Sequence, residues 1–231
     1  MKRFINLLTA LLSIAVLSPW AGSAQTPQTQ IKVSGLKFEK TQSILSPTTG
    51  PGSTDLKFSP KKWMMLEASM KIAAAPMPKS GYIDKLTVTF YLAASNPDKK
   101  GQYLKISKEI NYINIPVNEE FYVSTYMAPS SVKRLTGSDT IKPNMFEYMG
   151  LTVSFNGKEV ASISNKGGKM KEWWTVPSRT LVNTDSYPLL SKNETPFSIF
   201  WYDRYPEIMP TKESQSTPGS SPTPVAEDAE L

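Results

Sequence analysis

The side chains of this 231-residue chain can do only a narrow range of chemistry, because the sequence contains no Cys and no His. Without a thiolate or an imidazole, the chain lacks the nucleophile and general base of Ser-His-Asp and Cys-His hydrolases and the ligands that zinc and haem iron prefer. It also lacks disulfides, so apolar packing must hold the fold together. We therefore expect a binding or structural protein without a cofactor, or an enzyme based on carboxylates or Lys.

Paired carboxylates could support glycoside hydrolysis, which needs two acids about 5 to 10 Å apart. The candidates are Glu119, Glu120, Asp139, Glu147, Glu172, Glu194 and Asp203. Adjacent Glu119 and Glu120 would point to opposite faces of a strand and cannot act as a pair. Nothing in the spacing of the others selects two, so solvated surface acids are the favoured interpretation. The sequence predicts no catalytic residue.

Metal and phosphate sites have equally weak signals. Calcium loops need several acids or amides at alternate positions, and Asn96-Pro97-Asp98 and Asn183-Thr184-Asp185 each offer only two. The Gly-containing stretch 166–169 opens no predicted helix, as a phosphate loop would. We expect no metal and no cofactor.

Aromatic side chains near Lys are the remaining candidate site. Exposed Trp and Tyr stack on sugar rings and contribute to protein interfaces, and nearby Lys can meet acidic groups. Packing in the core or against a partner protein is favoured over a glycan platform. In a strand, adjacent residues face opposite sides, so at most one residue of each pair should be fully buried. The candidate partner or glycan surface consists of Trp173, Trp174, Trp201, Tyr202, Lys169 and Lys171.

Strands must position these residues. Apolar and polar residues alternate along 63–72 and 82–94, a period typical of half-buried strands. The pattern continues through 103–117, where it slips near Ile110 to Ile113 and predicts a bulge or a bend. Further strands are predicted at 31–38, 120–127 and 197–202, and a short helix at 130–135.

The segment 151–163 is the strongest local signal. Two alternating runs flank Asn156-Gly157, a dipeptide that accepts the positive φ angles of a type I′ turn. We predict a hairpin there. The alternation predicts a core that includes Leu66, Met70, Leu86, Val88, Phe90, Val153 and Phe155.

Seven or eight strands with little helix predict an all-β fold, an antiparallel β-sandwich with immunoglobulin-like character and at most one short helix. A closed barrel with a ligand cavity is the alternative. We assign 31–210 to this domain.

The ends of the chain read differently from the domain. Residues 1–24 combine a basic start, a short apolar run and a small-residue exit, the pattern of a secretory signal peptide cleaved before Gln25. No Cys follows the run, which argues against a lipoprotein anchor, and the run is too short to span a bilayer comfortably. Residues 25–30 are expected to be a flexible lead-in. The Pro-, Ser-, Thr- and acid-rich stretch 211–231 is expected to be a disordered tail.

Charge is uneven along the chain. Residues 25–206 contain 23 bases and 15 acids, whereas the stretch from Glu207 onward contains five acids and one base. A basic body can favour anionic surfaces, but the bases are scattered and only 166–171 forms a tight cluster. An ordinary solvated surface is the favoured interpretation.

The blocks 173–190 (WWTVPSRTLVNTDSYPLL) and 198–208 (SIFWYDRYPEI), together with the signal peptide, resemble small immunoglobulin-like secreted proteins encoded beside type IV pilus-like machinery in mucus-dwelling gut bacteria. This resemblance implies an immunoglobulin-like sandwich at the cell envelope that is associated with pili. No functional residue is carried over from it.

We therefore expect a non-enzymatic, exported envelope protein, located in the periplasm, on the outer membrane surface or outside the cell. Its role would be pilus-associated assembly or adhesion through envelope or pilus proteins, with no nucleic acid and no stable transmembrane span after signal cleavage. A carbohydrate-binding module that uses exposed Trp or Tyr is the alternative, and a carboxylate-based glycosidase is the third hypothesis.

Overall fold

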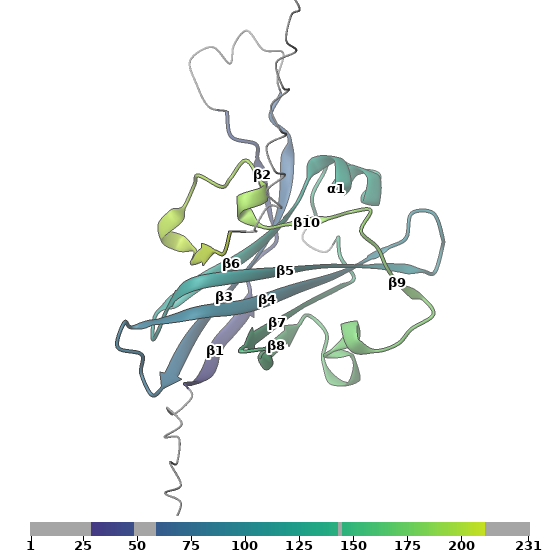
Figure 1. Cartoon of the computed structure of the whole chain (residues 1–231). Coiled ribbons are helices and arrows are strands. Elements are labelled where there is room, and N and C mark those ends of the chain that lie inside the picture. The colour runs from purple at the N-terminus through teal and green to yellow at the C-terminus, as the bar shows by residue number, and fades with distance from the viewer. Residues whose placement is uncertain (1–28, 49–58, 143–144, 211–231) are drawn as a thin grey trace, which may run out of the picture.

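The computed structural model describes residues 29–48, 59–142 and 145–210. The predicted signal peptide and the predicted tail lie outside these residues, as does the predicted lead-in except for its last two positions. The described chain forms two facing β-sheets, so the all-β sandwich is confirmed (Figure 1). No helix in the described residues is long and apolar enough to cross a membrane.

The first sheet has the strand order β1-β3-β6-β10, and β2 also pairs with β3. Its strands are β1 (Gln30–Phe38), β2 (Gln42–Leu45), β3 (Lys62–Ala75), β6 (Glu120–Met127) and β10 (Leu189–Leu190). All of its pairings are antiparallel. Strand β3 is the centre of this sheet because it pairs with β1 and β2 along one edge and with β6 along the other.

The second sheet has the order β11-β5-β4-β7-β8. Its strands are β4 (Tyr82–Ser95), β5 (Tyr103–Pro116), β7 (Tyr148–Phe155), β8 (Lys158–Ser164), β9 (Leu181–Asn183) and β11 (Glu207–Ile208). Its pairings are antiparallel except that β9 runs parallel to the start of β5.

The strand order follows the immunoglobulin pattern, which the alternation alone could not reveal. Strands β1, β3 and β6 take the places of A, B and E, and β5-β4-β7-β8 take those of C′-C-F-G. Strand β10 lies beside β6, where an immunoglobulin domain has strand D, although it comes much later in the sequence.

The core lies between the inner faces of the two sheets. Six of the seven predicted core residues are buried, and Phe155 is half-buried against the same cluster. Fully buried side chains such as Phe90, Leu92, Met70 and Ile72 alternate along their strands, as burial of one strand face requires.

The two predicted backbone irregularities have different outcomes. Asn156 and Gly157 have φ angles of 51° and 76°, so the hairpin turn is confirmed. The β4–β5 register runs without a shift through Ile110 to Ile113. The inward alternation instead slips at Asn114, where φ is 53°; the predicted bulge was therefore placed too early.

The predicted helix is confirmed as α1 (Pro129–Thr136), which ends at Gly137 with a φ of 71°. The predicted strand at 197–202 is wrong. This region is a turn between two short 3-10 helices, η3 (Lys192–Glu194) and η4 (Tyr202–Arg204). Its side chains pack against the outer face of the first sheet instead of joining its ladder.

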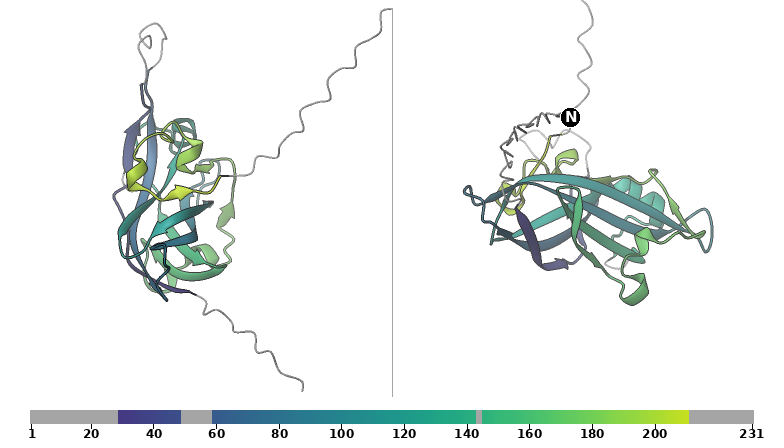
Figure 2. Two further views of the ribbon diagram at one scale, coloured as in Figure 1. Left: turned by 60° about the vertical axis from the view of Figure 1, so that its left-hand side comes forward. Right: turned by 60° about the horizontal axis from the view of Figure 1, so that its bottom comes forward.

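Both sheets have covered outer faces. The alternation placed Glu67 and Ser69 of β3 on a solvent face, yet both are buried. The chain after β10 runs back over the first sheet, and the chain after β8 folds under the second, as the two turned views make visible (Figure 2). These two coverings hold the predicted aromatic residues.

Candidate functional site

The first covering is the tryptophan cap, residues 165–181, which contains the 3-10 helices η1 (Gly168–Met170) and η2 (Trp173–Thr175). Trp174 stacks on Tyr91 of β4 with ring centroids 5.0 Å apart and 3° between planes. Trp173 packs at 5.5 Å from the ring of Tyr148 and at 5.7 Å, edge-on, from Trp174. The cap thus closes the outer face of β4 and β7 with aromatic rings.

Gly150 of β7 makes this packing possible. A Cβ at this position would overlap the ring of Trp174. The indole can lie flat on the sheet only because position 150 has no side chain.

The prediction that one of the adjacent Trp residues faces outward is wrong. Trp173 is 2% exposed and Trp174 is 6% exposed. Adjacent side chains point to opposite sides only in a strand. Trp173 and Trp174 lie in the 3-10 helix η2, which turns both indoles toward the same sheet face. Neither residue can form an exposed partner or glycan surface in this conformation.

Lysines surround the tryptophan cap. The Nζ of Lys105 donates to the backbone oxygen of Trp174 at 3.0 Å. Lys166 lies 4.7 Å above the ring of Tyr148 and pairs with Glu147 at 2.9 Å; the hydrogen bond from Lys166 to Glu147 raises the pKa of the Lys166 ammonium. Lys169 and Lys171 are exposed, as predicted for the rim of a binding surface.

The second covering is the C-terminal cap, residues 191–205. At its centre is Glu67, a carboxylate of β3 that is only 1% exposed. Arg204 donates to both of its oxygens, from Nε at 3.1 Å and from an Nη at 2.7 Å. The hydroxyl of Tyr205 donates to it at 2.6 Å. A buried carboxylate is stable only when it is paired and hydrogen-bonded in this way.

Burial and electrostatics change the titration of this cluster. Burial, followed by the hydrogen bond to Glu67, raises the pKa of the Tyr205 phenol well above its ordinary value. Burial also raises the pKa of Tyr126. The hydrogen bond to Glu67 raises the pKa of the Arg204 guanidinium further. The guanidinium also lies 3.7 Å above the ring of Tyr122 on β6, which fixes its plane.

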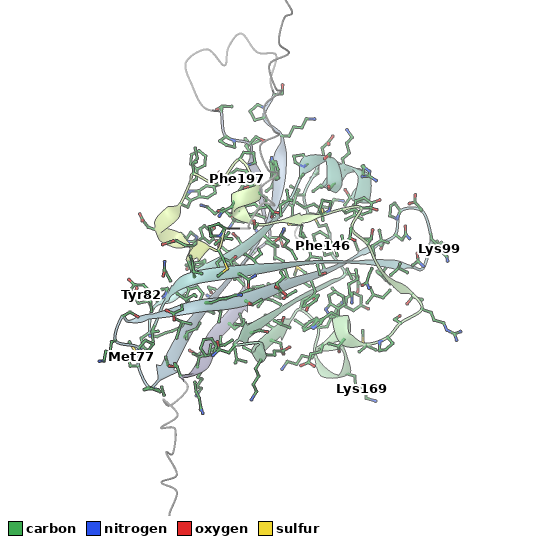
Figure 3. The ribbon with its side chains drawn as sticks, in the orientation of Figure 1. Met77, Tyr82, Lys99, Phe146, Lys169 and Phe197 are labelled. Carbon is green, nitrogen blue, oxygen red and sulfur yellow. The ribbon has the colours of Figure 1, made fainter. Side chains whose placement is uncertain are left out.

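An aromatic cluster completes the C-terminal cap beside the ion pair. Phe197 stacks on Tyr126 at 5.6 Å and meets Trp63 edge-on at 5.8 Å. Tyr126 and Met65 are buried beneath it. The labelled Phe197 lies above the sheets in the side-chain view (Figure 3).

Trp201 remains accessible, unlike the other Trp residues of the predicted site. Its indole stacks on Phe197 at 5.9 Å, and the residue is 47% exposed. Its φ of 56° places it in the left-handed region, which is rare for a bulky residue and costs backbone energy. The backbone N–H of Arg204 donates to its carbonyl at 3.2 Å. The side chain of Tyr202 lies outside what the structure describes.

A further apolar residue of the C-terminal cap, two positions before this ring, is also exposed: Ile199 is 63% exposed. Ile44 of β2 pairs with Trp63 of β3, and both side chains pack on the same face of the sheet as Phe197. We call Ile44, Trp63, Ile199 and Trp201 the Trp201 surface.

A cavity of about 330 Å³ adjoins the Trp201 surface. Its walls combine the indole of Trp201 and the side chains of Ile44 and Met65 with the polar groups of Gln42, Glu67, Arg204 and Tyr205. An aromatic wall next to convergent polar groups is a common design for small-ligand sites.

Six of the seven candidate carboxylates separate into two groups, and the seventh, Glu172, is exposed and accepts a hydrogen bond from Ser162 at 3.5 Å. Glu147, Glu194 and Asp139 are engaged in ion pairs with Lys166, Lys108 and Lys133. Glu119, Glu120 and Asp203 do line one open groove of about 640 Å³, with Asp84 and Glu207. All five acids of this groove are exposed, so none has the desolvated surroundings that a general acid at neutral pH requires. Among the described residues, no group of three or more acids could hold a metal ion.

Sequence reasoning missed Glu67, Arg204 and Tyr205. Glu67 fits the polar face of an alternating strand and carries no local sign of burial. The only hint was Arg204-Tyr205 next to Trp201-Tyr202, in a segment that was assigned to a strand.

Comparison with known proteins gives a family match and structural matches. A family model matches residues 22–212. The crystal structure of a protein from Akkermansia muciniphila is 48% identical, with a TM-score of 0.73, and the match covers 80% of this chain and 97% of that one. That organism is a mucus-dwelling gut bacterium, as the resemblance implied. No curated protein matches the chain.

Proposed function

Because this chain belongs to the family whose model matches residues 22–212, and because it is similar to the Akkermansia muciniphila protein, we propose that it is a non-enzymatic cell-envelope protein. Its role is to bind partner proteins in an assembly or adhesion complex associated with pilus-like machinery. The predicted signal peptide 1–24 would direct its export. N-terminal sequencing of protein from the native envelope tests this step: a mature chain beginning at Gln25 is expected, and an intact Met1 chain in the membrane contradicts it.

The observation that carries the binding role is the half-exposed indole of Trp201 beside the exposed Ile199. Both are among the most exposed large apolar residues of the described chain, and both belong to the C-terminal cap. Trp is enriched among the residues that dominate interface energies. The backbone at Trp201 has a strained, left-handed conformation, and the ion pair of Arg204 with Glu67 fixes the chain three residues later. Backbone strain of this kind is concentrated at functional sites.

Substitution of Trp201 tests this role. Trp201→Asn keeps a residue that tolerates positive φ and removes the indole. We expect partner capture from native envelope extract to weaken by about 2 kcal/mol, roughly 30-fold in Kd, with the fold intact. Tyr82→Asn is the matched control, since Tyr82 is similarly exposed but lies at the β3–β4 end of the molecule. Equal capture by both variants would contradict the proposal.

The cavity beside Trp201 favours a second candidate, a carbohydrate-binding module. One face of an indole next to Gln42, Arg204 and Tyr205 could take a single sugar ring. Saturable binding of a neutral glycan on an array, lost in Trp201→Asn, would replace the protein-binding role with this one.

A further inference from the structure

Two segments that are far apart in the sequence meet at one end of the second sheet. They are the β4–β5 connection, 96–105, and the tryptophan cap, 165–181. The backbone N–H of Tyr103 donates to the carbonyl of Thr180 at 2.6 Å, and β9 pairs with β5 directly beside it. Lys99 and Lys169 mark this end in Figure 3, and Met77 and Tyr82 mark the opposite end. We call it the basic end.

The basic end carries a large local excess of positive charge. Its two segments contain seven bases and two acids, Asp98 and Glu172. The bases are Lys99, Lys100, Lys105, Lys166, Lys169, Lys171 and Arg179. Among these seven, only Lys166 forms an ion pair within the described chain. Five of them are exposed, Lys105 and Lys166 being the exceptions.

The opposite end contains an acidic groove. The open groove there is lined by five acids and a single base, Arg204, whose guanidinium is already paired with Glu67. An anion is repelled by the acidic groove and attracted by the basic end, so it approaches the molecule at the basic end. Such separation concentrates and steers a charged partner more effectively than scattered charges do.

Two of the seven bases of the basic end, Lys105 and Lys166, are held in place by the aromatic cluster. Lys105 is tied to the backbone of Trp174, and Lys166 lies over the ring of Tyr148. Both contacts belong to the buried aromatic cluster that fixes the cap on the sheet. Charges on a fixed scaffold bind an anionic chain with a smaller loss of conformational entropy.

We propose that the basic end binds a linear polyanionic glycan that carries sulfate or carboxylate groups. Exposed Lys and Arg on two neighbouring segments match anionic groups repeated along one chain. A single-stranded nucleic acid would require exposed rings for base stacking, and Trp173 and Trp174 are buried. The site shares no residue with the Trp201 surface, so glycan binding at the basic end can be tested independently of the proposed protein-binding role.

Heparin, a sulfated glycan, is the probe for this site. The full mature chain is compared with the variant Lys99→Gln/Lys100→Gln/Lys169→Gln/Lys171→Gln. The matched control is Lys32→Gln/Lys79→Gln/Lys85→Gln/Lys158→Gln, which loses the same charge from exposed positions elsewhere. Binding is measured by calorimetry at three salt concentrations, and circular dichroism checks that each variant is folded.

We expect the basic-end variant to bind heparin at least 10-fold more weakly and with a shallower salt dependence, while the control and Trp201→Asn change by less than 3-fold. Dextran, a neutral glycan, should not bind. Equal losses in both quadruple variants would overturn the proposal, because binding would then follow net charge alone. Binding of duplex DNA or of vesicles rich in anionic lipid as tightly as heparin would overturn the assignment to a glycan.

Discussion

The tryptophan cap and the C-terminal cap are held on their sheets by different interactions. Each covers the outer face of a sheet with a segment that has almost no regular structure. The tryptophan cap uses stacked indoles over Gly150, and its buried Trp173 indole N–H has no acceptor among the described residues. The C-terminal cap uses a buried carboxylate with three donated hydrogen bonds. Stacking area thus outweighs one unmet donor in the first cap, whereas the second depends on complete pairing.

This difference also bears on function. The tryptophan cap buries its rings, and three of its four exposed charged residues, Lys169, Lys171 and Arg179, are basic. The ion-paired cap fixes Arg204 and so supports an exposed indole three residues away. The tryptophan cap therefore presents charge, and the C-terminal cap presents apolar surface.

Removal of the main stacking ring should have the largest effect. Trp174→Ala takes away the ring that lies on Tyr91 and Gly150, and we expect a loss of roughly 3–5 kcal/mol in the free energy of unfolding. Urea denaturation followed by circular dichroism measures it. The exposed neighbour Glu172→Gln should change stability by less than about 0.5 kcal/mol. Similar effects of the two changes would show that the cap is not an energetic part of the fold.

Loss of the buried ion pair between Glu67 and Arg204 should have the second largest effect on stability. Arg204→Leu leaves Glu67 buried without its cation, at an expected cost of about 3 kcal/mol; the 43% exposed Arg204 side chain places this at the lower end of the range for buried pairs. The double variant Glu67→Leu/Arg204→Leu should recover most of the loss in urea denaturation, because no uncompensated charge remains. A double variant as unstable as Arg204→Leu would show that shape and not charge holds this cap.

A methyl group at position 150 should have a moderate effect that is confined to the tryptophan cap. Gly150→Ala forces the Trp174 ring away, and we expect a loss of about 2 kcal/mol. The same change in a Trp174→Ala background should cost almost nothing, because the ring is gone. A double-mutant cycle measures this coupling, and additive losses would contradict the proposed contact.

The smallest of these effects is a loss of stability at alkaline pH, which should depend on the C-terminal cap and not on the tryptophan cap. The folded-state pKa of Tyr205 is raised above its ordinary 10.0, so the unfolded chain loses this proton first. The stabilisation is fully present below pH 10 and is lost as pH rises above it. We expect the Tyr205 contribution to the free energy of unfolding to decrease by about 1 kcal/mol between pH 10 and 11, and this part of the decrease to be absent in Tyr205→Phe. Buried Tyr112 and Tyr126, whose pKa values are also raised, add to the slope in both proteins. The tryptophan cap contains no Tyr, and its Lys166 pairs with Glu147, so Trp174→Ala should leave the Tyr205 part of the slope unchanged.

Much of the fold follows from local pattern. The alternation in 63–72 and 82–94 predicted the core faces that bury Leu66 and Phe90, and Asn156-Gly157 predicted its turn. These succeeded because burial of one strand face and the φ requirement of a type I′ turn act over a few neighbouring residues.

The candidate site was less predictable. Trp201 and Lys169 were singled out correctly as accessible residues, but Trp173 and Trp174 were not. Whether an aromatic residue faces outward depends on the turn that carries it and on what lies opposite, here Gly150, which is more than 20 positions earlier in the sequence.

The sequence by itself determined the chemistry that is absent, the strand faces and the hairpin, because residue type and short-range periodicity set these directly. The tertiary structure alone decided that Glu67 is buried, that Arg204 meets it from 137 residues away, and that Lys99 and Lys169 share one end of the molecule. The physical reason is that solvation and charge pairing depend on distance in space, and only the folded chain brings such residues together.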